Sequence, residues 1–70
     1  LINLSFETID DGNVTVRLID LTGNVVWTKV EGAFKGVNER TYDISTLARG
    51  VYMLQLSVND QTEIIRVVLQ

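Results

Sequence analysis

Apolar and polar residues alternate with a period of two along most of this chain. In an extended segment this alternation places the apolar side chains on one face, as in a strand that is buried on one side only. No segment shows a sustained apolar period of ~3.6 residues, so no long helix is expected. The sequence therefore predicts six strands, at residues 2–8, 13–20, 24–31, 38–44, 50–58 and 62–69.

The connections between these strands are short. Segments 10–13 and 59–61 are rich in residues that tolerate a left-handed backbone and predict hairpin-like turns. Residues 32–36 predict a longer loop with an apolar tip, and residues 45–49 predict one helical turn that Gly50 ends. Short strands at roughly ten-residue spacing indicate an all-β fold, an antiparallel two-sheet sandwich of Ig-like character with about six to seven short strands.

The apolar faces of these strands supply the predicted core. It comprises Leu4, Phe6, Val14, Val16, Leu18, Val26, Ile44, Leu47, Tyr52, Leu54, Leu56, Ile65 and Val67. The last strand is harder to orient because both of its faces are apolar, and exposing both Val67 and Val68 would create a sticky edge. We therefore expect that strand 62–69 is central in its sheet or that its outer face meets a partner.

The composition limits the chemistry that the chain can perform. Its 70 residues allow a single domain. There is no Cys for a disulfide or a thiolate, and no His to act as a general base or a metal ligand. The net charge is −3 and the six cations are scattered, which argues against a nucleic-acid partner. We expect no catalytic residue, no metal site and no cofactor, and hence no enzyme.

The segment Asp20-Leu21-Thr22-Gly23 predicts a tight structural turn. An Asp at the first position of a turn accepts a hydrogen bond from the backbone N–H two residues further on. Gly23 supplies the positive φ with which the chain re-enters a strand through a bulge. Asp20 and Gly23 are therefore assigned to the turn itself.

A second segment, Leu47-Ala48-Arg49-Gly50-Val51-Tyr52, predicts the start of the fifth strand. Leu47 is expected to fill the end of the core, and Gly50 to let the backbone enter an extended strand. Tyr52 is expected to bury its ring and to direct its hydroxyl to a backbone partner, as in a tyrosine corner.

Trp27 is the one aromatic residue that suggests a ligand. It follows Val26 in a strand, so the two side chains point to opposite faces. With Val26 in the core, Trp27 is partly exposed or is covered by Phe34 from the neighbouring loop. An exposed Trp can stack on a sugar ring, which leaves a carbohydrate-binding or fibronectin-like accessory module of a secreted hydrolase as an alternative function.

Segments 20–23 and 47–52 and the closing run 64–70 together resemble the type A C-terminal sorting domain of the type IX (Por) secretion system of Bacteroidetes-type Gram-negative bacteria. In that family a D-x-x-G turn leads into a V-V strand, L-x-x-G-x-Y opens the penultimate strand, and a short β-branched strand closes the chain. The matching residues here are Asp20 to Gly23 with Val25-Val26, Leu47 through Gly50 to Tyr52, and Ile64 to Gln70.

The resemblance implies that residues 1–70 form a single C-terminal sorting domain. Such a domain directs a cargo protein across the outer membrane for release or cell-surface attachment, after passage through the periplasm. The implied partners are an outer-membrane secretion translocon and a sortase-like peptidase. The surface expected to be recognised consists of the last two strands and the tail: Gly50, Tyr52, Ile64, Ile65, Arg66, Val67, Val68, Leu69 and Gln70.

The chain departs from the family pattern in two places. The Pro-Asn-Pro segment that usually stands ahead of residues 3–6 is absent, so we expect that the family's first strand is missing here. Its absence would leave unpaired backbone groups beside strand 2–8, which predicts a homodimer, swapped strands or edge-to-edge contacts. The family also often ends with lysines, whereas this chain has only Arg66 near its end.

Overall fold

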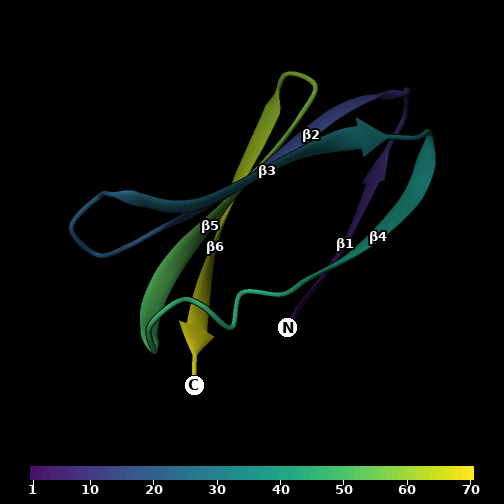
Figure 1. The fold of residues 1–70 in the computed structure, drawn as a ribbon. Coiled ribbons are helices and arrows are strands. Elements are labelled where there is room, and N and C mark those ends of the chain that lie inside the picture. Colours follow the sequence, from purple (N-terminus) through teal and green to yellow (C-terminus); the bar gives the residue numbers. More distant parts are fainter.

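The computed structural model describes all residues from 1 to 70 and consists of six strands joined by short connections (Figure 1). The predicted ranges 2–8 and 50–58 are confirmed, and the other four are right to within two residues at each end. The strands are β1 (Ile2–Thr8), β2 (Gly12–Ile19), β3 (Val25–Ala33), β4 (Gly36–Tyr42), β5 (Gly50–Val58) and β6 (Gln61–Leu69).

The strands form two antiparallel sheets, as expected for a small sandwich. One sheet has two strands in the order β1-β4, and the other has four in the order β3-β2-β5-β6. Only β2–β3 and β5–β6 are hairpins, because every other connection passes from one sheet to the other. The turn predicted at 59–61 is confirmed, with Asn59 at φ +54° between the paired residues Val58 and Gln61. The hairpin predicted at 10–13 is wrong, since this segment joins the two sheets.

The core is centred on β2 and β5, the two strands with a neighbour on each side. The buried residues of these strands are the alternating positions Val14, Val16, Leu18, Tyr52, Leu54 and Leu56. Ala33, Tyr42 and Ile44 complete the buried apolar cluster, and Leu4, Phe6, Leu47 and Val67 are half-buried against it. Two predicted core residues are exposed instead, Val26 by 37% and Ile65 by 42%.

A bulge in β3 explains the misplaced Val26. Leu18 pairs with Trp27, but the next residue, Ile19, pairs with Val25, so Val26 has no partner. An extra residue shifts the two-residue period and turns the following side chains to the opposite face. Trp27 therefore points inward, and its ring meets that of Tyr42 edge-on with the centroids 5.1 Å apart. Phe34 does not cover it, since Phe34 is 70% exposed.

Two connections differ from their predicted form. Only Phe34 and Lys35 separate β3 from β4, so the longer loop at 32–36 is wrong. The Asn38 side chain closes this link, because its oxygen accepts the Phe34 N–H at 3.0 Å and its nitrogen donates to the Phe34 carbonyl at 2.7 Å. Segment 45–49 is a turn and not a helix, with the Leu47 N–H donating to the Ile44 carbonyl at 3.0 Å.

Candidate functional site

The residues predicted to be recognised lie together on one two-stranded ribbon formed by β5 and β6. Within it Gly50 pairs with Leu69, Tyr52 with Val67, and Leu54 with Ile65. Gln70 follows directly after β6. The ribbon closes at the Asn59-Asp60 turn and ends beside the segment that leads into β5 (Figure 1). We call residues Gly50–Val58 and Gln61–Leu69 with Gln70 the terminal ribbon.

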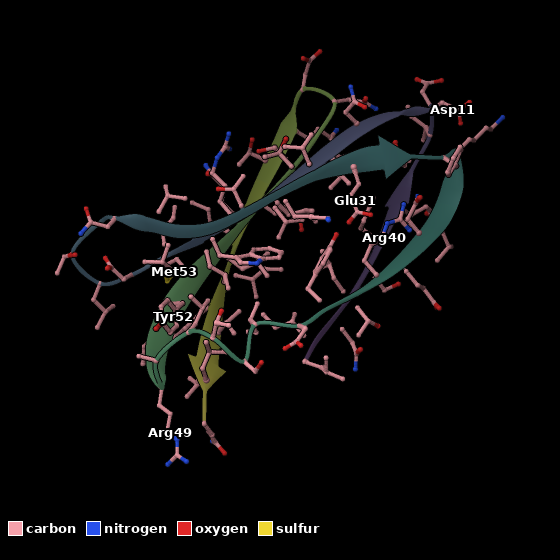
Figure 2. All side chains as sticks on the ribbon, in the orientation of Figure 1. Asp11, Glu31, Arg40, Arg49, Tyr52 and Met53 are labelled. Atoms are coloured by element: carbon pink, nitrogen blue, oxygen red, sulfur yellow. The ribbon has the colours of Figure 1, made fainter.

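Tyr52 anchors the start of this ribbon to the chain before it (Figure 2). Its ring is buried, and its hydroxyl donates a hydrogen bond of 2.6 Å to the carbonyl oxygen of Ala48. This bond confirms the predicted hydroxyl-to-backbone contact. Gly50, between the two partners, has a φ of +151°, a conformation that residues with a side chain rarely adopt. The corner therefore depends on Gly50 for its path and on Tyr52 for its closure.

The Asp20 turn lies at the far end of the β2–β3 hairpin and does not belong to the terminal ribbon. One oxygen of its carboxylate accepts hydrogen bonds from the Thr22 N–H at 2.9 Å, the Thr22 hydroxyl at 2.6 Å and the Asn24 N–H at 3.0 Å. The Thr22 hydroxyl, followed by the Asn24 N–H, holds the pKa of Asp20 below its usual value of 3.8. Gly23 has a φ of +91°. Both residues have the structural role predicted for this turn.

Strand β6 is an edge strand, because it pairs only with β5. Of the two alternatives expected for this strand, the central position is therefore wrong, and an outer face that meets a partner stays a prediction. Its register places Ile65, Val67 and Leu69 on the side of the core and Ile64, Arg66 and Val68 on the opposite side. Ile64 is 61% exposed and Val68 52% exposed. An exposed apolar edge of this kind presents unpaired backbone groups and favours pairing with another strand.

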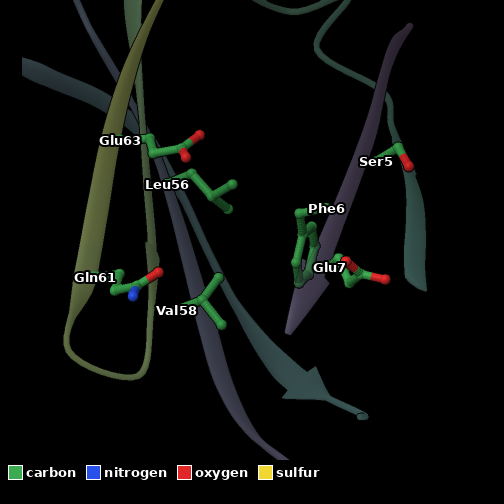
Figure 3. A pocket seen from close by; sticks show the side chains of 7 residues that line it. All are labelled: Ser5, Phe6, Glu7, Leu56, Val58, Gln61 and Glu63. Carbon is green, nitrogen blue, oxygen red and sulfur yellow. The ribbon is translucent and has the colours of Figure 1, made fainter. Parts of the chain in front are cut away.

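A groove runs between β1 and the terminal ribbon, and sequence reasoning did not find it. It has a volume of about 270 Å³, and Figure 3 shows its wall of side chains from the two sheets. The lining residues are Ser5, Phe6, Glu7, Leu56, Val58, Gln61 and Glu63. On its β1 side the groove ends at an unpaired strand edge, since β1 pairs only with β4. The groove is therefore bounded by two free edges, that of β1 and that of β6.

The electrostatics of the terminal ribbon are simple. Arg66 is exposed and takes part in no ion pair or hydrogen bond, and the chain's one salt bridge joins Arg40 and Glu31 on the other side of the sandwich. No cluster of three or more acidic side chains is arranged to hold a metal ion. The structure has no helix that is long and apolar enough to cross a membrane. What the ribbon offers is backbone edges and apolar side chains, which are means of binding another chain.

The stacking site for a sugar finds no support in this geometry. The ring of Trp27 is half-buried and packs against Tyr42 between the two sheets. A sugar ring needs an open aromatic face, whereas this face is turned toward the core.

Comparison with known proteins gives one match. The family model described as the secretion system C-terminal sorting domain matches residues 1–70, the whole chain. No curated protein and no solved structure matches this chain.

Proposed function

Because this chain belongs to the family of secretion system C-terminal sorting domains, we propose that the terminal ribbon is the surface by which the secretion machinery recognises it. Domains of this family are C-terminal sorting signals for type IX secretion, and the type IX machinery recognises them. The cargo that carries such a domain is a secreted or cell-surface protein of Bacteroidetes. A sorting signal of this kind is not itself catalytic.

The free edge of β6 is the observation that carries this proposal. A strand that adds to a sheet edge gains backbone hydrogen bonds for affinity, and it gains specificity from the alternate side chains. On β6 those side chains are Ile64, Arg66 and Val68, all exposed, with Ile65, Val67 and Leu69 on the side of the core. Gly50 and Tyr52 contribute by fixing where β5, the only neighbour of β6, begins.

The proposed route has two partners in sequence. The folded domain is carried with its cargo through the periplasm to a translocon in the outer membrane. A sortase-like peptidase at the cell surface then removes the domain, and the cargo is released or attached. The structure fits such a label because a removable label needs a recognisable surface and no chemistry of its own.

Removing the end of the ribbon tests the proposal. A reporter fused ahead of residues 1–70 is expected to reach the surface of a host with a type IX system. Deleting residues 66–70 should trap the reporter in the periplasm, because it removes Arg66 and Val68 from the outward side of β6 and Val67 and Leu69 from the side of the core. Normal export of the truncated fusion would show that the tail is not read.

A pair of point variants separates recognition from folding. Ile64→Ser removes an exposed apolar side chain from β6, and Phe34→Ser removes an equally exposed one from the β3–β4 link. Surface changes of this kind alter stability by only about 0.5 kcal/mol. Export should fall for Ile64→Ser and not for Phe34→Ser. Equal export of the two variants would contradict a role for the ribbon.

We further propose that an extended strand fills the groove between β1 and the terminal ribbon. The occupant that we propose is a strand of the kind that carries the family's Pro-Asn-Pro segment. Pairing would satisfy the free edge of β1 and would cover Phe6, Leu56 and Val58 in the groove. Without that strand, residues 1–70 would satisfy the same edges by pairing with a second copy, which gives the homodimer.

Sedimentation velocity tests this second proposal. Residues 1–70 alone are expected to form dimers that dissociate on dilution. The same chain extended at its N-terminus by a strand that carries the family's Pro-Asn-Pro segment is expected to be monomeric, because the added strand occupies the groove. A monomer at every concentration for residues 1–70, or an unchanged dimer for the longer chain, would be inconsistent with this proposal.

A further inference from the structure

The outward side of the four-stranded sheet carries more apolar residues than a solvent-facing sheet requires. Antiparallel sheets that face water on one side usually alternate apolar residues inward with polar residues outward. Here seven outward positions are apolar, and they come from all four strands: Ile19, Val25, Val30, Val51, Met53, Ile64 and Val68. We call the outward side of β3, β2, β5 and β6 the outer face.

The register makes most of these residues neighbours. Ile19 pairs with Val25 on one side and with Met53 on the other, so the three form a row across β3, β2 and β5. Val51 lies two residues from Met53 on the same face of β5 and pairs with Val68 on β6. Directly opposed residues in an antiparallel pair have their Cβ atoms ~5 Å apart. Five of the apolar residues therefore form one continuous patch at the Gly50 end of the sheet: Ile19, Val25, Val51, Met53 and Val68.

Two arginines border this patch, and no acidic residue accompanies them. Arg66 pairs with Met53. Arg17, on β2, pairs with Gln55, which lies two residues after Met53 on the same face of β5. Neither guanidinium takes part in an ion pair or a hydrogen bond within the chain. No outward position of β2, β3, β5 or β6 is Asp or Glu, although the chain has nine acidic residues. The outer face is thus cationic on a molecule whose net charge is −3.

Charge complementarity identifies the chemistry of what would cover this face. Arg17 and Arg66 lie on strands two places apart and are offset by two residues along β5, which puts their backbones ~12 Å from each other. A guanidinium holds a carboxylate with two parallel hydrogen bonds, and Arg is enriched in protein interfaces while Lys is depleted. Met is enriched there as well, and Met53 lies between the two arginines.

The same composition argues against a lipid surface as the occupant. Proteins that adsorb to anionic membranes use clusters of ~4–8 basic residues, and residues at the membrane interface are often Trp or Tyr. The outer face has two cations, and none of the outward positions is aromatic.

We propose that the outer face docks a component of the secretion machinery whose own surface is apolar and carries carboxylates placed to meet Arg17 and Arg66. This inference rests on the proposed function and extends it beyond the terminal ribbon, because Arg17, Ile19 and Val25 belong to β2 and β3. The machinery would then read a sheet face as well as a strand edge.

Charge reversal in the reporter fusion tests the proposal. Arg17→Glu combined with Arg66→Glu should lower export about tenfold, because the two new carboxylates of the domain would then face the carboxylates of the partner. The matched control is Lys29→Glu with Lys35→Glu, which changes the net charge equally at exposed positions outside the outer face. The control should export within about twofold of the unchanged fusion. Equal export of the two double variants overturns the proposal.

Single variants separate this proposal from the one on which it rests. Arg17 lies outside the terminal ribbon, so Arg17→Glu alone should lower export, and Arg17→Lys should lower it less. If deletion of residues 66–70 traps the fusion in the periplasm and the Arg17→Glu fusion is exported normally, the outer-face proposal is wrong and recognition of the ribbon stands. If the fusion that lacks residues 66–70 is exported normally, the ribbon proposal is wrong, whatever the export of the Arg17→Glu fusion.

Photocrosslinking identifies the class of the partner. The domain has no Cys, so Met53→Cys places a single thiol at the centre of the outer face for a maleimide-benzophenone probe. An adduct with a type IX component that disappears in Arg17→Glu supports the proposal, and Phe34→Cys, at an exposed position of the β3–β4 link, serves as the control position. No protein adduct, or flotation of the domain with phosphatidylglycerol vesicles that Arg17→Glu abolishes, overturns it in favour of a lipid surface.

Discussion

The sandwich is joined along the side where β3 faces β4 and open along the side where β1 faces β6. On the joined side the Trp27 and Tyr42 rings meet at 5.1 Å, the Arg40 side chain donates to the Gly32 carbonyl at 2.9 Å, and the Arg40 Nε lies 3.8 Å from Glu31 Oε2. On the open side β1 and β6 belong to different sheets and do not pair, and their ribbons lie apart (Figures 1 and 3). Only the Asn59 side chain, at the end of the ribbon, reaches Thr8, at 3.4 Å.

This difference separates what holds the domain together from what it presents. The joined side places aromatic rings, a salt bridge and a short covalent link between the sheets, and all of these stabilise the fold. The open side leaves two strand edges and a groove, which contribute little to the fold and are free to bind. The residues that we assign to recognition lie on the open side and on the outer face of the four-stranded sheet.

Removing Tyr42 should have the largest effect on stability. Tyr42→Ala takes away a buried ring that packs on Trp27, and it should lower the free energy of unfolding by about 3 kcal/mol. Phe34→Ala, at an exposed aromatic ring, should change it by no more than about 0.5 kcal/mol. Urea unfolding followed by the fluorescence of the single Trp would measure both. Similar losses in the two variants would mean that the joined side does not hold the sheets together.

Two Tyr→Phe variants compare the hydroxyls of the two sides with smaller expected effects. Tyr52→Phe removes the donor to the Ala48 carbonyl at the start of the ribbon and should cost about 1 kcal/mol. The Tyr42 hydroxyl is buried and has no hydrogen-bond partner, so Tyr42→Phe should be neutral or slightly stabilising. The same unfolding measurement checks both values. A larger loss for Tyr42→Phe than for Tyr52→Phe would reverse the assignment of the two hydroxyls.

The alternation of β5 was sufficient to predict its bounds and its buried face, and the likeness of Tyr52 to a tyrosine corner predicted its hydroxyl bond. It was sufficient because a central strand is buried on the face that its own sequence marks as apolar. Trp27 and Val26 were assigned to the wrong faces because the bulge beside Ile19 adds one residue to β3, and a single added residue reverses the pattern. That bulge depends on pairing with β2, which the local sequence does not show.

The position of β6 and the groove could not be predicted for a related reason. Apolar residues on both faces are typical of a central strand and also of an edge strand that awaits a partner, so the local pattern of β6 fits both. Which is right depends on the order of the strands in each sheet. The orders β1-β4 and β3-β2-β5-β6 leave β1 and β6 unpaired at one edge each. It is a property of the topology and not of any single segment.

Alkaline pH offers the finest test of the joined side. Burial, and secondarily the neighbouring Glu31, raises the pKa of Tyr42 from 10.0 to about 12. The folded state therefore favours the neutral phenol, and this contribution to stability is complete below pH 10, where the unfolded chain also keeps its proton. It should be lost as the pH rises from 10 to about 12, because the unfolded chain gives up the proton first. Urea unfolding at stepped pH should show this decline in the unchanged chain and a smaller one in Tyr42→Phe. An identical decline in both would mean that the ionisation of Tyr42 does not cause the loss of stability at alkaline pH.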